Sequence, residues 1–356
     1  MLLYFIIEKQ INDRCLRSFR AVIHVNGIRG KTSTCRYIDA ALRSRYRVFT
    51  KTTGTDAMYI DTNGNEYPVR RFGPANLHEQ IRTIRKAKKE GAEILILECM
   101  AVNPELQEIA QEQIVKSSIT VITNVRYDHI FEMGDTLTSI AASLSATIPE
   151  NGTLYTAEPR ARELFGARCQ ERNCRLVVLD STGTQSENIG IARAIAASFS
   201  ITEEEFLANL PNVHEDFGIR TLYPVQNSAG EVFHFLNLFS ANDPQSTRSN
   251  VESERSDFSR LYFLYNHRED RPDRALLFAR YFFPYYKECT VFITGRGAAL
   301  PARLFRGAGV SGLHILKDTS VLPSLPPGSL LVGIGNIKGA GYRIITTLEE
   351  EKRKHE

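Results

Sequence analysis

A buried-strand pattern, a glycine-containing loop and a helical pattern follow one another near the start of the chain. Residues 21–25 read AVIHV, and the stretch from Lys31 to about residue 45 has the spacing of a helix. Between them, Gly27 and Gly30 permit a tight turn that directs backbone N–H groups at an anion. The alternative is a chance Gly-Lys-Thr turn, but the strand-loop-helix order favours a loop that binds nucleotide phosphates.

The residues of this loop have distinct predicted roles. Lys31 is expected to reach the β- and γ-phosphates, and the Thr32 hydroxyl is expected to hold Mg²⁺. The position five residues before Gly30 is Val25, where the usual phosphate loop has a glycine, so the loop has a short G-x-x-G-K-[ST] form. The predicted nucleotide-binding residues here are Asn26, Gly27, Arg29, Gly30, Lys31, Thr32 and Ser33.

Apolar runs continue to alternate with amphipathic stretches beyond this loop. Further strands are expected at residues 47–50, 92–98, 119–124 and 176–179, and helices at 78–90, from Pro104 and at 187–198. This alternation predicts an α/β fold with a central, doubly wound, mostly parallel sheet of the phosphate-loop type. After a polar stretch at 211–230, a smaller, Rossmann-like α/β domain is predicted from runs at 232–238, 261–265, 290–294 and 329–333.

The length of 356 residues supports about two domains. We predict a docking or membrane-proximal segment at 1–20, a central ATPase domain at 21–215 and a C-terminal substrate domain at 216–356. The apolar start ends at Glu8, far short of the roughly 20 residues of a spanning helix, and no signal-peptide cleavage site follows it. It could lie on a membrane surface, dock to a partner, or be a strand or helix buried in an oligomer.

Composition excludes some functions. The net charge of +3, without a long basic run or an aromatic-basic stripe, argues against nucleic acid as a partner. Six cysteines without the spacing of a zinc site indicate reduced thiols in a cytoplasmic protein.

Polar residues close two of the predicted strands. Glu98 ends the run at 92–98, where a Mg²⁺ ligand is favoured over a solvated strand end, because ligands gather at the carboxyl ends of parallel strands. Asn124, Asp128 and His129 follow the next strand. An isolated Asp-His pair more often makes a surface hydrogen bond, but its position after the phosphate loop and Glu98 favours a metal site.

The short loop, together with Asn124-x-x-x-Asp128-His129, resembles the motifs of Mur ligases and folylpolyglutamate synthases. This resemblance implies that His129 ligates a metal, that Asn124 and Asp128 shape the metal and substrate site, and that Arg220 meets the phosphates. Asn188 is similar in place to an adenine-side Asn of that family. The expected catalytic residues are Lys31, Glu98, His129 and Arg220, and the expected metal ligands are Thr32, Thr53, Thr55, Glu98 and His129.

A closer resemblance, over nearly the whole chain, is to the ligase subunits of poly-γ-glutamate (capsule) synthases. It is carried by the segments at 26–31, 51–57, 98–104, 146–149, 241–243, 266–274 and 333–337. The resemblance implies an ATP- and Mg²⁺-dependent ligase (with Mn²⁺ as an alternative ion) that polymerises glutamate through an acyl phosphate. It also implies a membrane-embedded synthase or export partner and a peripheral position at the inner face of the membrane; a homo-oligomer stays open.

The chain departs from Mur ligases in two respects. It has no Lys between Lys116 and Lys287, so a carbamylated lysine that helps to hold a second metal is not expected. The nucleotide-sugar-binding domain that precedes the phosphate loop of Mur ligases is missing, which disfavours a peptidoglycan precursor. Two other functions stay open: a folylpolyglutamate-synthase-like ligase that adds glutamate to another acceptor, and a non-catalytic nucleotide-binding assembly module.

Arginines in the second predicted domain could recognise the substrate. Arg268, Arg271 and Arg274 form a patch whose planar guanidinium groups suit the carboxylates of glutamate and its polymer. A solvated face with salt bridges is the alternative. Asn242 and Asp243 follow a predicted strand and are expected to contact the nucleotide.

Overall fold

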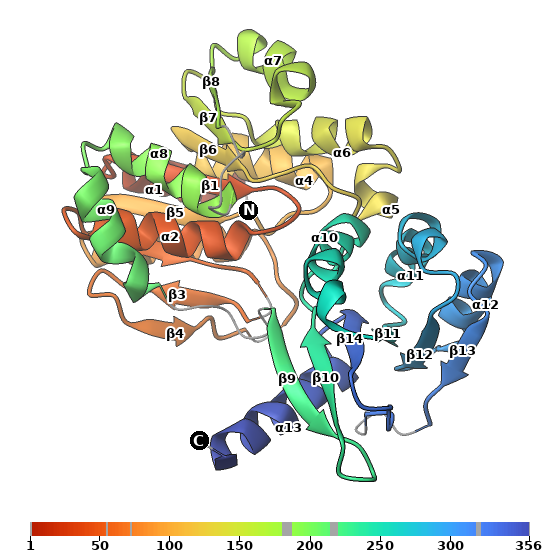
Figure 1. Ribbon diagram of the computed structural model, residues 1–356. Coiled ribbons are helices and arrows are strands. Elements are labelled where there is room, and N and C mark those ends of the chain that lie inside the picture. Colours follow the sequence, from red (N-terminus) through yellow and green to blue (C-terminus); the bar gives the residue numbers. More distant parts are fainter. Residues whose placement is uncertain are drawn as a thin grey trace. The chain divides into compact units, whose positions relative to one another are not determined.

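The computed structural model describes residues 2–54, 56–71, 73–179, 187–213, 220–317 and 322–355. The chain divides into two compact units, shown in Figure 1. Unit 1 comprises Met1–Arg126 and Ile130–Asp216, and unit 2 comprises Tyr127–His129 and Phe217–Glu356. Each unit contains a mostly parallel sheet with helices packed on both faces, so the predicted α/β class is confirmed.

Unit 1 is built on an eight-stranded sheet in the order β4-β3-β2-β5-β1-β6-β7-β8. Its strands are β1 (Ala21–Asn26), β2 (Val48–Lys51), β3 (Met58–Ile60), β4 (Glu66–Pro68), β5 (Ile94–Glu98), β6 (Ile119–Ile122), β7 (Thr153–Thr156) and β8 (Arg175–Val178). Neighbouring strands are parallel except in the β2–β3 and β3–β4 pairs.

Successive residues of the central strands point to opposite faces of this sheet, and both faces are covered. Ile23 and Val25 of β1 pack with α2 (Lys31–Arg43), α8 (Glu187–Ser198) and α9 (Glu203–Asn209). Val22 packs on the other face, with α1 (Leu2–Leu16), α3 (His78–Lys89) and a π-helix, η1 (Ala110–Val115). The remaining helices of unit 1 are α4 (Pro104–Ile109), α5 (Ile130–Met133), α6 (Leu137–Leu144) and α7 (Ala161–Glu171).

The start of the chain is helical. The last turn of α1 is buried through Cys15 and Leu16, and the Asn12 side chain donates to the Ile114 carbonyl oxygen at 2.8 Å. Ile6 and Ile7 are both 46% exposed. Among the helices that the structure describes, none combines the length and the hydrophobicity that crossing a membrane requires.

Unit 2 contains a six-stranded sheet in the order β13-β12-β11-β14-β10-β9, antiparallel between β9 and β10 alone among its described pairs. The strands are β9 (Thr221–Gln226), β10 (Val232–Asn237), β11 (Arg260–Asn266), β12 (Thr290–Thr294), β13 (Gly312–Ile315) and β14 (Ser329–Gly335). One face carries α10 (Pro244–Glu254), α11 (Pro272–Tyr281) and α12 (Ala299–Gly307), and the other carries α13 (Ala340–His355).

Among the strands that were not anticipated from the sequence are β3, β4, β9 and β13. The stretch at 211–230, interpreted as an interruption, contains β9, an edge strand whose Pro224 is tolerated there because one side needs no ladder partner. The β3–β4 hairpin surrounds an Asn63-Gly64 turn, a common hairpin signal that should have revealed it. β13 is short and half exposed, so its sequence carries little apolar pattern.

A buried histidine predicts how stability depends on pH. His24 lies on β1 with no exposed surface, and burial lowers its pKa from 6.5 to about 4. The unfolded chain therefore binds a proton at a higher pH than the folded chain, so stability is lost as the pH falls from 6.5 towards 4. The expected loss from this residue between pH 7 and pH 4 is about 3 kcal/mol.

The measurement is urea unfolding of the parent and of His24→Gln across that range. Burial raises the pKa of Asp39 to about 6, and this has the opposite effect on stability in the same window. The difference between variant and parent isolates His24 because Asp39 is common to both. Between pH 7 and pH 4, the free energy of unfolding of the parent should fall by about 3 kcal/mol relative to that of the variant. A difference between the two proteins that does not change with pH would contradict the prediction.

Candidate active site

The carboxyl ends of three neighbouring strands meet in unit 1. Strand β1 lies between β5 and β6, and in this register Val25 pairs with Glu98 and Asn26 with Ile122. After β1, the chain forms β2 and β5 on one side of β1, and it later forms β6 on the other side. Ligands of open α/β sheets bind at such a change of direction.

The loop after β1 requires its two glycines. Gly27 has φ 120° and Gly30 has φ 78°, values that side chains disfavour. A Cβ atom on Gly27 would lie 2.7 Å from the backbone nitrogen of Thr123, and one on Gly30 would lie 2.4 Å from Oδ1 of Asn188. The tight fit on both sides fixes the path of the loop and brings Asn188, which was predicted at the nucleotide site, against it.

Asn124 holds the tip of the same loop. Its Oδ1 accepts a hydrogen bond from the Arg29 backbone nitrogen at 3.0 Å, and its Nδ2 donates to the Arg29 carbonyl oxygen at 3.1 Å. Thr123 donates to the same carbonyl oxygen at 2.6 Å. Asn124 was predicted to be a substrate residue, and the contact that the structure gives it is with the phosphate loop.

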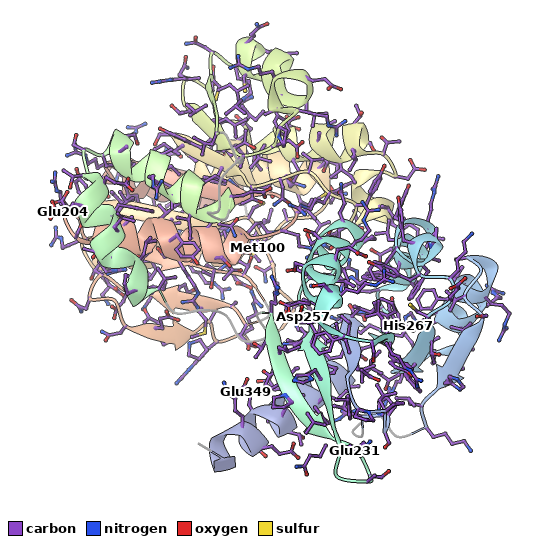
Figure 2. All side chains as sticks on the ribbon, in the orientation of Figure 1. Met100, Glu204, Glu231, Asp257, His267 and Glu349 are labelled. Atoms are coloured by element: carbon purple, nitrogen blue, oxygen red, sulfur yellow. The ribbon has the colours of Figure 1, made fainter. Side chains whose placement is uncertain are left out.

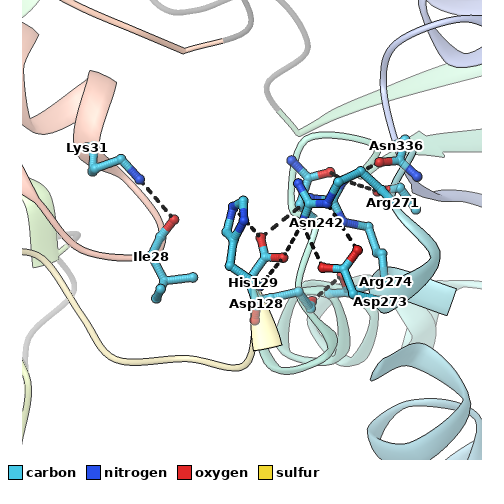
Figure 3. A network of polar contacts seen from close by, with 12 residues as sticks. Ile28, Lys31, Asp128, His129, Asn242, Arg271, Asp273, Arg274 and Asn336 are labelled. Atoms are coloured by element: carbon cyan, nitrogen blue, oxygen red, sulfur yellow. Dashed lines mark hydrogen bonds and ion pairs between the residues drawn. The ribbon is translucent and has the colours of Figure 1, made fainter. Parts of the chain in front are cut away.

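The helix after the loop begins at Lys31, and Gly30, its N-cap, provides no side-chain hydrogen bond. The first N–H groups of a helix carry a partial positive charge and attract anions. The Lys31 ammonium is folded back over the loop and donates to the carbonyl oxygen of Gly27 at 2.8 Å. It also donates to that of Ile28 at 3.5 Å, as Figure 3 shows. Lys31 and Ser33, on the first turn of α2, are both partly exposed.

Glu98 is 2% exposed, and its carboxylate joins the phosphate loop to the loop after β2. Its Oε2 accepts hydrogen bonds from the Thr32 hydroxyl at 3.0 Å and from the Thr53 backbone nitrogen at 2.6 Å. Thr53 thus contributes its N–H group here, whereas its hydroxyl was predicted to bind metal. Thr55 lies outside the described residues.

A carboxylate beside a hydroxyl fits a Mg²⁺ ion that takes few protein ligands and completes its shell with phosphates and water. In the part of the chain that the structure describes, no three His, Cys, Asp or Glu side chains come together in a manner that could hold a metal ion. Glu98 and Thr32 are the described residues of unit 1 that fit such an ion.

A cluster of charged side chains lies beside Glu98 and was not predicted from the sequence. The Lys51 side chain, at the end of β2, has no exposed surface, and its Nζ lies 3.3 Å from Oε2 of Glu79. Arg71 binds both oxygens of the same carboxylate, at 2.8 and 3.1 Å. Lys51 also approaches the sulfur of Met100 at 3.7 Å (Met100 is labelled in Figure 2). Burial lowers the pKa of Lys51, and a lysine that closes a buried strand is the signal that could have revealed the cluster.

Asp128 lies within unit 2 and is 1% exposed. Its Oδ1 lies 2.6 Å from Nη2 of Arg271, and its Oδ2 lies 3.4 Å from Nη2 of Arg274, as Figure 3 shows. Arg271 also binds both oxygens of Asp273 at 3.1 Å. His129 has a positive φ of 51°, and its Nε2 lies 3.8 Å from Oδ2 of Asp128.

The three arginines predicted to bind substrate differ in their surroundings. Arg274 is 5% exposed and donates to Asn242 Oδ1 at 3.0 Å and to the side chain of Asn336. Arg268 makes a side-chain ion pair with Asp270 near the surface. The solvated-face alternative therefore describes Arg268, whereas it is wrong for Arg274, whose partners lie far away in sequence.

The other predicted residues of unit 2 have partners within the same unit. Arg220 is exposed and forms an ion pair with Glu254. The Asp243 side chain is the N-cap of α10 and accepts from the Ser246 backbone nitrogen at 2.8 Å. Asn242, with φ 60°, contacts Arg274.

Similarity to known proteins extends over nearly the whole chain. The family model of the Mur ligase middle domain matches residues 25–214, and that of the poly-gamma-glutamate synthase CapB C-terminal domain matches residues 222–351. The chain is 32% identical to the capsule biosynthesis protein CapB of Bacillus anthracis, over 99% of this chain and 81% of the relative. It is also 32% identical to the PGA synthase CapB of Bacillus subtilis (strain 168), over 98% and 95% of the two chains.

Among solved structures, the fold is similar to that of a bifunctional folylpolyglutamate synthase/dihydrofolate synthase from Yersinia pestis, complexed with AMPPNP and Mn ion. The TM-score is 0.69, with 13% identity over 97% of this chain and 92% of that chain. At this identity the similarity concerns the fold.

Proposed function

The chain belongs to the poly-gamma-glutamate synthase CapB family, with a middle domain of the Mur ligase family, and we propose that it is an ATP-dependent amide ligase that joins glutamate residues through their γ-carboxylates. The observation that carries this proposal is the arrangement at the carboxyl ends of β1 and β5. There a glycine loop, a lysine and a buried carboxylate bonded to a hydroxyl lie together in unit 1.

The reaction overcomes the low reactivity of a carboxylate towards an amine. An oxygen of the γ-carboxylate attacks the γ-phosphorus of ATP, the bond to ADP breaks, and an acyl phosphate forms. The amino group of a second glutamate then attacks the acyl carbon, inorganic phosphate leaves, and the nitrogen loses a proton. Each amide bond therefore consumes one ATP and releases one ADP and one phosphate.

Residues of this chain would stabilise the charge that moves during the first step. Lys31 would turn from the Gly27 carbonyl oxygen to the γ-phosphoryl group, and the N–H groups of the loop and of α2 would face the other phosphate oxygens. Glu98 and Thr32 would hold the divalent cation, which supplies positive charge at the phosphates. We propose Mg²⁺ as this ion; the relative from Yersinia pestis was solved with Mn.

Several finer assignments are also proposals. Residues 21–215 would act as the ATPase domain and 216–356 as the substrate domain, with Arg268 contacting glutamate carboxylates and Arg220 contacting phosphates. His129 would be a second metal ligand. The capsule-related names of the relatives support glutamate and its polymer as substrates. We propose a membrane-embedded partner that holds the ligase at the inner face of the membrane, and a docking role for residues 1–20.

The test is analysis of the products that purified protein forms from ATP, Mg²⁺ and glutamate. We expect γ-linked glutamate oligomers by mass spectrometry, with ADP and phosphate released in equal amounts and one of each per new bond. Oligomers that resist α-peptidases but yield to a γ-glutamyl hydrolase would establish the linkage. A product with glutamates added to a different acceptor would favour a folylpolyglutamate-synthase-like activity. Nucleotide binding without acceptor-dependent hydrolysis would favour an assembly module.

A further inference from the structure

Two buried carboxamides lie beneath the phosphate loop. Asn26, the last residue of β1, is 2% exposed, and Gln107, on α4, has no exposed surface. Nδ2 of Asn26 donates to Oε1 of Gln107 at 2.7 Å, although the two residues are 81 positions apart. We call these two side chains the amide pair.

The amide pair connects two loops at the carboxyl end of the sheet. Oδ1 of Asn26 accepts from the backbone nitrogen of Gly27 at 2.8 Å, at the start of the phosphate loop. Nε2 of Gln107 donates to the carbonyl oxygen of Val102 at 2.8 Å, on the loop that follows Glu98 and β5. The phosphate loop and the loop after β5 are therefore joined through side chains beneath the site.

The groups at the two ends of this series of hydrogen bonds, the Gly27 N–H group and the Val102 carbonyl oxygen, fix the direction of every bond between them. The Gly27 N–H group can only donate, so Asn26 must present its oxygen to it and its nitrogen to Gln107. The Val102 carbonyl can only accept, so Gln107 must present its nitrogen there and its oxygen to Asn26. Neither amide can rotate by 180° without opposing two acceptors or two donors in a buried place, which is costly. The two end groups therefore lock one orientation of both amides.

Further contacts hold the amide pair in place. Asn26 also donates to the Thr147 hydroxyl at 3.2 Å, and Gln107 to the Ser143 hydroxyl at 3.2 Å. With these bonds, the side chain of Asn26 is engaged within the protein through both its oxygen and its nitrogen, although it was predicted to bind nucleotide.

We propose that Gln107 is a positioning residue for nucleotide binding, because it fixes Asn26 and, through Asn26, the Gly27 N–H group of the phosphate loop. This inference rests on the proposed function of that loop. Without Gln107, Asn26 retains Thr147 as a partner but can rotate, and the loop then adopts the binding conformation for a smaller part of the time. The apparent dissociation constant rises in inverse proportion to that fraction.

The helix that carries Gln107 offers a matched control. Gln111 follows one turn later, in the π-helix, and is also buried at 2% exposure. Its Oε1 contacts Nδ1 of His24 at 3.1 Å and accepts from the Ser117 hydroxyl at 3.0 Å, so its described contacts do not include the phosphate loop. Methionine has nearly the volume of glutamine, and Gln111→Met therefore removes a comparable buried amide from the same helical segment.

The experiment titrates the parent, Gln107→Met and Gln111→Met with AMPPNP and Mg²⁺ by calorimetry, and measures thermal unfolding and hydrogen exchange at Gly27. We expect both variants to melt at lower temperature. Only Gln107→Met should bind AMPPNP about 10-fold more weakly, a factor typical of one lost buried hydrogen bond, and exchange the Gly27 amide faster. Equal affinity of Gln107→Met and the parent, or equal weakening by Gln111→Met, would overturn the inference.

A second variant covers the case in which Gln107→Met does not fold. Gln107→Glu keeps an acceptor for Asn26 and replaces the amide nitrogen, which donates to Val102 and Ser143, by an oxygen. It should also bind AMPPNP more weakly than Gln111→Met does, and parent-like affinity would again overturn the inference. Failure of the parent itself to bind AMPPNP would instead refute the proposed function, so the two outcomes are distinguishable.

Discussion

Lys31→Ala should lower the rate of glutamate-dependent ADP release by about a thousandfold at saturating ATP, since loss of a single preorganised donor at a developing charge costs about that much. Lys31 is the first residue of α2, and its ammonium lies 2.8 Å from the carbonyl oxygen of Gly27. A carbonyl oxygen carries only a partial charge, so a triphosphate would attract the ammonium more strongly. Because the attraction grows as charge moves onto the leaving oxygen, the turnover number should fall more than the affinity for ATP.

Two variants accompany this measurement. Lys31→Arg keeps the charge but presents a planar group, so it should retain part of the activity. Lys88→Ala, at an exposed position of α3, should match the parent. Parent-like turnover in folded Lys31→Ala would contradict the role given to this loop.

Asp128→Ala should destabilise unit 2 by about 3–5 kcal/mol, because removing one partner of a buried ion pair leaves the other charge uncompensated. The carboxylate is 1% exposed and lies between the guanidinium groups of Arg271 and Arg274, of which Arg274 is 5% exposed. Asp273 remains to compensate Arg271, so the larger part of the loss should come from Arg274. Urea unfolding followed by circular dichroism should show the transition of unit 2 at a lower midpoint.

Asp270→Ala provides the comparison, since it removes a partner of Arg268 from an exposed ion pair and should cost less than about 1 kcal/mol. The double variant Asp128→Ala/Arg274→Met removes both buried charges and should recover part of the stability lost in Asp128→Ala. A loss in Asp128→Ala no larger than that in Asp270→Ala would disprove the buried-charge account.

The parts of the fold that follow from local pattern were predictable. Strand β1, the glycine loop and α2 are encoded by adjacent residues. The apolar run before Glu98 predicts β5, because a strand covered on both faces must be apolar throughout. Glu98 and Thr32 were predicted to share a metal site, and a hydrogen bond of 3.0 Å joins them. Their role as metal ligands stays a prediction.

Contacts between distant segments could not be predicted in the same way. Asp128 meets Arg271 and Arg274 across 143 and 146 positions, and no periodicity in a single sequence links them. The arginines were therefore interpreted by their chemistry, as ligands for substrate carboxylates, although the protein itself supplies a carboxylate for each of them. Lys51 and Glu79 are likewise joined only by the parallel pairing of β2 and β5 and the packing of α3.

The assignment of Tyr127–His129 to unit 2 has a consequence for the order in which the protein matures. During synthesis Asp128 leaves the ribosome 146 residues ahead of Arg274, a delay of roughly 7–30 s at ordinary elongation rates. The ring of Tyr127 stacks on that of Tyr281, with the two centroids 4.3 Å apart, and this contact becomes possible after a still longer delay. In the nascent chain, the segment Tyr127–His129 cannot make its contacts with Arg274 and Tyr281 until those residues have been synthesised. A polypeptide that ended at residue 216 would lack both of them.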